Sequence, residues 1–99
     1  MINESWQLAQ GNEMIGRLYL SDVDQPWFMC TFEPAEGWEA VRSLFEEQSE
    51  AMKARDPRRI GISMSAINSL DLRLLPLKGG GEVAPVMIHI VEGEAKFRI

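Results

Sequence analysis

The sequence predicts an α+β fold with one antiparallel sheet of about six strands in the order βββ-α-α-βββ and with the helices packed on one face. Two patterns carry this prediction. Apolar and polar residues alternate toward both ends of the chain, whereas in the middle apolar residues recur every three or four positions. A length of 99 residues with 45% hydrophobic composition fits one domain, 1–99, with a small core.

Alternation near the N-terminus predicts a three-stranded meander. A turn at Gln10–Asn12 would place Trp6 opposite Gly16 and Leu8 opposite Met14. An aromatic ring over a cross-strand glycine is a favourable pairing, because glycine leaves its backbone uncovered. The three expected strands are 4–9, 13–21 and 27–33.

A five-residue loop, Asp22–Pro26, is expected to join the second and third strands. It would place Leu20 opposite Phe28 and Leu18 opposite Cys30. One face would then turn toward the core. That inner face is expected to carry Trp6, Leu8, Met14, Leu18, Leu20, Phe28, Cys30 and Phe32.

Helical spacing of apolar residues predicts an amphipathic helix over 36–55. A second, short helix is favoured over 57–68, because Asp56 suits an N-cap and Pro57 suits the first helical position. The same stretch also alternates like a strand, and Gly61 weakens a helix. A strand therefore stays open as the alternative there.

Alternation resumes at 70–75, and after the glycine-rich loop at 79–81 it predicts a hairpin of Val83–Val91 with Glu94–Ile99 about Glu92-Gly93. Apolar residues then meet on one face and polar residues on the other. The expected pairs are Ile90 with Ala95, Ile88 with Phe97, Val86 with Ile99, His89 with Lys96 and Met87 with Arg98. Whether the sheet is open or a partly closed barrel is left undecided.

Four segments of the chain resemble a group of small bacterial proteins of about this length. They are IGRLYLSDVDQPWFMCTFEP, LDLRLLPLKGGGE, IHIVEG and AKFRI, which are turn and strand patterns without a catalytic signature. The resemblance implies a cytoplasmic bacterial protein. No activity or ligand is known for that group, so it carries over no functional residues.

Charge and composition exclude several function classes. A net charge of −5 disfavours nucleic acid and anionic membrane surfaces as partners. The sequence has no apolar run long enough to cross a membrane, and its first residues do not read as a secretory signal. The lone Cys30 cannot form an internal disulfide, which predicts a reducing, cytoplasmic location.

Candidate catalytic and metal-binding patterns are weak. Asp22 and Asp24 lack the further oxygen ligands of a cation loop, so a turn is the preferred interpretation and no metal or other cofactor is predicted. Cys30 and His89 are expected on opposite faces, which disfavours a Cys/His dyad. Two such residues are too few for zinc, and the glycines at 79–81 lack the residues of a phosphate loop. An enzyme is therefore unsupported, and no catalytic residue is assigned.

The outer sheet face holds the candidate binding residues. It is expected to gather aromatic and basic side chains with one acid, Asp71. That face is more apolar than a surface that contacts only solvent, which favours a protein interface, either with a partner or between copies of the chain. A small anionic ligand is the alternative, and an enzyme with His89 as base ranks last. The candidates are Arg17, Tyr19, Trp27, Met29, Arg73, Met87, His89, Lys96 and Arg98.

Overall fold

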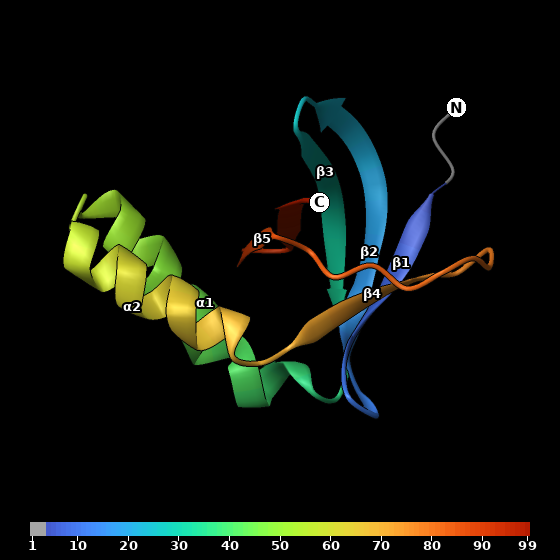
Figure 1. The fold of residues 1–99 in the computed structure, drawn as a ribbon, viewed down its shortest axis with the longest axis horizontal. Helices are drawn as coiled ribbons and strands as arrows, with labels where there is room; N and C mark the ends of the chain where they lie inside the picture. The colour runs from blue at the N-terminus through green and yellow to red at the C-terminus, as the bar shows by residue number, and fades with distance from the viewer. Residues whose placement is uncertain (1–3) are drawn as a thin grey trace.

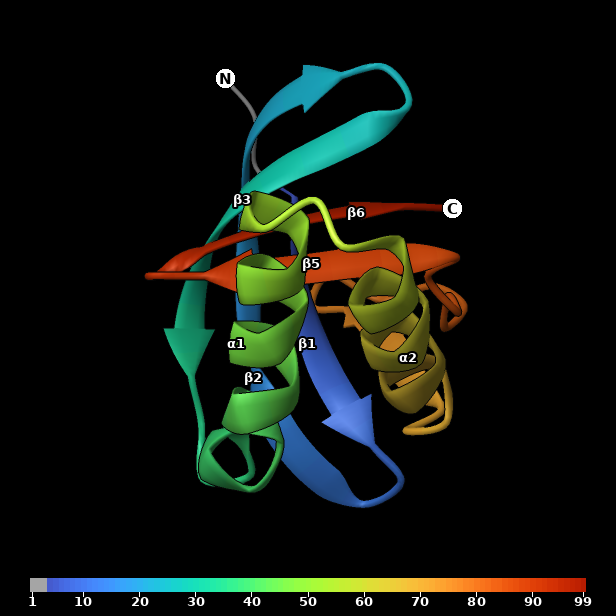
Figure 2. The same ribbon diagram turned by 90° about the vertical axis from the view of Figure 1, so that its left-hand side faces the viewer.

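The computed structural model describes residues 4–99 and confirms the α+β class. Six antiparallel strands form one curled sheet in the order β4-β1-β2-β3-β6-β5, and two helices lie side by side against one face of it (Figures 1 and 2). The elements are β1 (Ser5–Gln10), β2 (Glu13–Asp24), β3 (Trp27–Pro34), α1 (Trp38–Lys53), α2 (Pro57–Asn68), β4 (Leu72–Pro76), β5 (Met87–Val91) and β6 (Glu94–Arg98). Residues 1–3, part of the segment in which the sequence predicts no secretory signal, lie outside the described range.

The core lies between the inner face of the sheet and the two helices. Phe45 of α1 and Leu8, Leu18 and Leu74 of the sheet are fully buried there, because the helical stripe and the strand alternation both direct apolar residues to this space. Phe97 of β6 stacks on Phe28 of β3, with 5.1 Å between ring centroids. Among residues 4–99, no helix is both long and apolar enough to span a membrane.

The register of β1 on β2 differs from the prediction. Trp6 pairs with Leu18 and Leu8 pairs with Gly16, so the indole does not cover the glycine. The ring that lies against Gly16 belongs to Phe32 of β3, which takes the space that a side chain at position 16 would need. The predicted packing of Trp6 on Gly16 is therefore wrong, and a ring from the other neighbouring strand covers this glycine.

A β-bulge explains the shift between β1 and β2. The turn has two residues, and Ala9 pairs with Met14, so Ile15 has no partner on β1 before Leu8 meets Gly16. The bulge turns Ile15 into the core, where it is fully buried, although alternation predicted it on the outer face. Met14 is only partly buried, so its predicted place in the core is also wrong.

The expected loop Asp22–Pro26 is wrong, because β2 continues to Asp24 and turns through Gln25-Pro26 alone. Leu20 pairs with Cys30, not with Phe28. A second bulge lies at Ser21, whose hydroxyl donates a hydrogen bond to the Met29 carbonyl oxygen at 3.0 Å. The longer hairpin projects beyond the rest of the sheet, as Figure 1 shows at the top.

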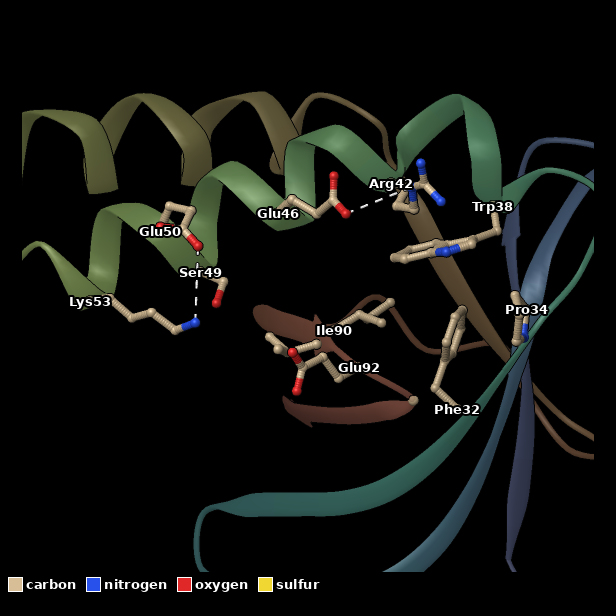
Figure 3. Close-up of a pocket in the computed structure, with 12 residues that line it drawn as sticks. Phe32, Pro34, Trp38, Arg42, Glu46, Ser49, Glu50, Lys53, Ile90 and Glu92 are labelled. Atoms are coloured by element: carbon tan, nitrogen blue, oxygen red, sulfur yellow. Dashed lines mark ion pairs between the residues drawn. The ribbon is translucent and has the colours of Figure 1, made fainter.

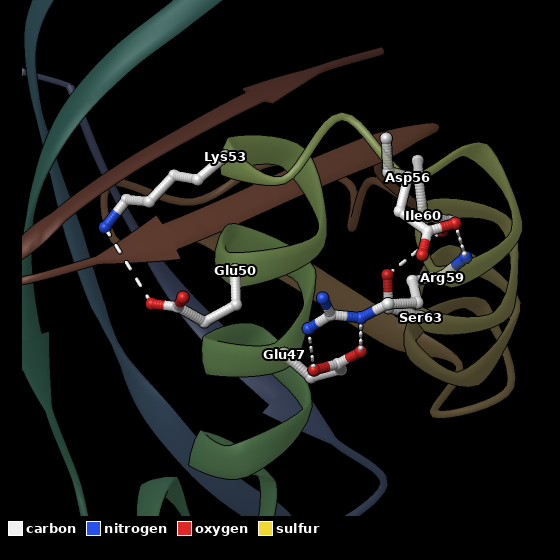
Figure 4. Close-up of polar contacts among 7 residues, drawn as sticks. All are labelled: Glu47, Glu50, Lys53, Asp56, Arg59, Ile60 and Ser63. Atoms are coloured by element: carbon white, nitrogen blue, oxygen red, sulfur yellow. Dashed lines mark hydrogen bonds and ion pairs between the residues drawn. The ribbon is translucent and has the colours of Figure 1, made fainter.

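The helices follow the local signals in the sequence. The Asp56 carboxylate accepts hydrogen bonds from the backbone N–H groups of Arg58 and Arg59 at 3.2 and 3.3 Å, which caps α2 as predicted and excludes the strand alternative. Arg59 also forms two hydrogen bonds to the Glu47 carboxylate, at 2.9 and 3.0 Å, which join α2 to α1 (Figure 4). Helix α1 begins at Trp38, two residues later than predicted, because a turn closed by the Trp38 N–H and the Ala35 carbonyl oxygen precedes it, and it ends at Lys53, two residues earlier than predicted.

The C-terminal hairpin has the predicted turn and four of the five predicted pairs. Glu92 and Gly93 both have positive φ, which suits the two-residue turn that twists with the strands. The fifth pair is wrong, since Val86 N–H bonds to the Arg98 carbonyl and β5 begins only at Met87. The segment before it is not a strand, because Val83 bonds to β4 as an isolated bridge.

Candidate functional site on the outer sheet face

Six of the nine candidate residues lie on three neighbouring strands of the outer face, which is the face turned away from the helices. The strand order brings β3, β6 and β5 together, and the register places Met29 beside Lys96 and Lys96 beside His89. Trp27 and Arg98 lie one pair further along the same strands. These residues form the outer-face cluster, made of Trp27, Met29, Met87, His89, Lys96 and Arg98.

Trp27 is the aromatic centre of this cluster. Its ring lies 5.5 Å from the His89 ring between centroids, at 51° between planes, and the Lys96 ammonium lies 4.9 Å from the indole centroid. A cation over an indole face is attracted by the ring quadrupole, which fixes the tryptophan against β6 and β5. The indole remains partly exposed and available for further contact.

His89 is 7% exposed, and neither of its ring nitrogens has a hydrogen-bond partner among residues 4–99. Burial lowers its pKa from the ordinary value, and the positive charge of Lys96 lowers it further. The imidazole is therefore neutral at neutral pH. It lines a depression of about 500 Å³, together with Met29, Thr31 and Lys96.

Arg98 and Met87 complete the outer-face cluster, one across from the other on β6 and β5. The Arg98 Nε is buried and has no hydrogen-bond partner in the described part of the chain. Leaving a buried donor of a charged group unsatisfied costs free energy, so this position is energetically unfavourable within one molecule.

The remaining three candidates lie apart from this cluster. Arg73 belongs to β4, at the opposite end of the sheet, and pairs with Asp71 at 3.0 Å. Arg17 of β2 sits directly across from Glu33, and Tyr19 sits across from Thr31. The four basic candidates that an anionic ligand would need, Arg17, Arg73, Lys96 and Arg98, are therefore not gathered into one site.

Two acidic residues of this face were not predicted from the sequence. The bulge at Ser21 turns Asp22 and Asp24 to the outer side, where they pair with Met29 and Trp27. The signal was present, because Ser-Asp-Val-Asp continues a strand-like alternation, but two aspartates before a proline favoured a loop. The face is thus mixed in charge, and the expectation of a single acid, Asp71, is wrong.

Cys30 lies on the other side of the sheet, as predicted. It is buried in the core, and burial raises the pKa of its thiol to about 12, so it is not a thiolate at neutral pH. Within residues 4–99, no three histidine, cysteine or acidic side chains are close enough together to hold a metal ion.

A larger hollow that the sequence did not predict lies between α1 and the β5–β6 turn (Figure 3). It measures about 630 Å³, and its apolar end is formed by Trp38 and Phe32, whose ring centroids are 4.9 Å apart. Its cations are already engaged, Arg42 with two glutamates of α1 and Lys53 with a third. The α1 residues that line this hollow recur at helical spacing in the sequence. This spacing does not indicate which hairpin the helix faces, so the hollow could not be predicted.

Comparisons of the chain with protein-family models, with curated proteins and with solved structures found no match. The bacterial origin that the sequence suggested therefore stays a prediction, and any function has to be argued from the geometry alone.

Proposed function

We propose that this protein is a non-catalytic protein-binding module that uses the outer face of its sheet. The observation that carries the proposal is the partly exposed Trp27 held in place by Lys96 and His89. A partly exposed aromatic side chain held between a cation and a neutral imidazole resembles the anchor residues that dominate protein interfaces. Because the ring is already fixed by its neighbours, little conformational entropy is lost when a partner covers it.

The surroundings of Trp27 support an interface over a solvated face. Met29 and Met87, which lie in the same cluster as Trp27, are only partly buried, and Tyr19 and Leu75 are exposed further away on the same side of the sheet. Apolar side chains in such number on one face are typical of a surface that another protein covers. The mixed charges around them match the polar rim that surrounds the centre of most interfaces.

The chemistry of the titratable groups supports a non-catalytic role. The buried Cys30 thiol is protonated at neutral pH and faces away from His89. His89 has no carboxylate hydrogen-bonded to its ring among the described residues, so nothing orients it as a general base.

A small ligand in the depression beside His89 is the second candidate. The unpartnered imidazole and the Lys96 ammonium could both contact an anion there. Glu92 and Glu94 line the same depression and oppose an anion, which is why this candidate ranks second. A thermal-shift screen with phosphorylated and carboxylated metabolites tests it. A rise in melting temperature that is lost in Lys96→Ala supports the ligand, and no rise at millimolar concentration excludes it.

Site-specific photo-cross-linking tests the protein-binding function. A photoreactive phenylalanine analogue replaces Thr31 on the outer face, or Ile62 on α2 as a control at a 61% exposed position. In cells that make the protein, the Thr31 variant is expected to give a protein adduct of defined mass, and the Ile62 variant none. No adduct at Thr31, or the same adducts at both positions, would contradict the proposal.

A further inference from the structure

The outer face carries its charges in an ordered pattern across three neighbouring strands. At the end of the face that carries Trp27, acids lie on β2, apolar residues on β3 and bases on β6, at matching positions along the strands. At the other end of these strands the order reverses, with Arg17 on β2 and Glu94 on β6. In that order, the acidic column is Asp22 and Asp24, the apolar column is Met29 and Trp27, and the basic column is Lys96 and Arg98.

The acidic and basic columns do not neutralise one another within one molecule. They lie two strands apart, which is about 10 Å, with the apolar column between them. None of the four charged residues has an ion-pair partner among residues 4–99. The pattern therefore leaves unpaired acids on β2 and unpaired bases on β6, with Met29 between them and with the Trp27 ring leaning over β6 toward His89.

We infer that the partner of this face is a second copy of the same chain, bound about a two-fold axis parallel to β3. This inference rests on the proposed function and names its partner. Rotation about that axis lays one apolar column on the other and brings each acidic column over the basic column of the partner subunit. An axis across the strands would instead place acid on acid, so the charge order selects one of the two arrangements.

The matching positions along the strands define the contacts. Asp24 lies level with Arg98 and Asp22 lies level with Lys96, so Asp24 meets Arg98 of the partner subunit and Asp22 meets Lys96 of the partner subunit. The first contact supplies a carboxylate to the Arg98 guanidinium, which has no ion-pair partner among the described residues of one molecule. Both contacts occur twice, because the interface is symmetric.

Other kinds of partner fit this pattern less well. A basic protein would satisfy the acidic column and repel the basic column, and an acidic protein would do the reverse. The occupant needs both charges, in the opposite order, on either side of apolar residues. The rotated face of a second copy supplies that order without any further assumption.

A charge-swap experiment tests the dimer. Native mass spectrometry and sedimentation equilibrium are measured for the wild type, for Asp22→Lys/Asp24→Lys, and for Lys96→Glu/Arg98→Glu. The wild type is expected to dimerise, whereas each variant alone places like charges against each other and loses at least about tenfold in affinity. An equimolar mixture of the two variants is expected to restore a dimer that contains one copy of each.

Thermal unfolding monitors the fold of each variant. If Arg98→Glu impairs folding, the single pair Asp22→Lys and Lys96→Glu gives the same test with one swapped contact. A wild type that is monomeric at every concentration overturns the inference, as does a variant that dimerises like the wild type or a mixture that stays monomeric. A monomeric wild type whose Thr31 cross-links to a different protein would overturn the dimer and leave the protein-binding function standing.

Discussion

His89 is the titratable residue whose environment most directly links the outer face to stability. Its imidazole is buried beside Trp27 and close to Lys96, and both burial and the lysine disfavour its protonated form. The folded protein therefore keeps His89 neutral at a pH at which the unfolded chain, with the ordinary value of 6.5, already binds a proton.

This pKa shift predicts a loss of stability on mild acidification. The stabilising contribution is complete above pH 6.5 and decreases as the pH falls from there toward the lowered pKa of His89, because the unfolded state binds more protons in that window. Between about pH 7.5 and about pH 5.5, the melting temperature of the wild type should fall more than that of His89→Gln. Parallel decreases in the two proteins would show that His89 does not carry the effect.

Gly16 is the residue on which the packing of β2 against β3 depends most. A Cβ added there would overlap the Phe32 ring and lie 2.7 Å from the Glu33 carbonyl oxygen, so both the core and the strand would have to shift. Gly16→Ala should lower the free energy of unfolding by about 2 kcal/mol or more in chemical denaturation. Gly61→Ala, at an open position in α2, is the matched control and should raise it by about 0.5 kcal/mol. Equal effects of the two substitutions would contradict the packing described for Gly16.

At the scale of the element, α2 depends on its N-terminal cap. Asp56→Ala removes the acceptor of two backbone N–H groups and should cost about 1 kcal/mol of unfolding free energy. Asp56→Asn keeps a side-chain oxygen in the same place and should cost much less. If the two variants unfold at the same denaturant concentration, the hydrogen bonds at this cap do not contribute to stability.

The elements that the sequence predicted well are those with local signals. Asp56-Pro57 indicates the start of α2, and Glu92-Gly93 determines the turn and the register of the last hairpin. The first meander was predicted as three strands but in the wrong register. Each of its two bulges adds one residue to β2 at Ile15 and Ser21, and a bulge has no residue pattern of its own that marks it in the sequence.

In the candidate site too, the residues placed by a local signal were predicted, and those placed by a bulge or by strand order were not. His89 and Lys96 were placed side by side because a two-residue turn sets their pairing. Asp22 and Asp24 were missed because only the bulge at Ser21 turns them outward beside Met29. The separation of Arg73 from the other basic candidates follows from the strand order, which depends on long-range pairing that alternation does not specify.

At the scale of the whole molecule, the curled sheet has helices on one face and none on the other (Figure 1). Apolar residues of the covered face form the core with the helices. The uncovered face carries Trp27, the His89 ring and the unpaired charges of β2 and β6. A protein with a net charge of −5 would be expected to resist self-association. The ordered charges of the outer face provide a local attraction that opposes this general repulsion.

Sedimentation velocity of two matched methionine variants tests most directly whether this face is the interface. Met29 lies in the apolar column, where it would meet Met29 of the partner subunit, whereas Met52 is a 42% exposed residue of α1 on the opposite side of the sheet. The wild type and Met52→Lys should shift with rising concentration from an 11.2 kDa monomer to a dimer, and Met29→Lys should remain a monomer throughout. A monomeric wild type, or a Met29→Lys protein that dimerises like the wild type, would contradict the account.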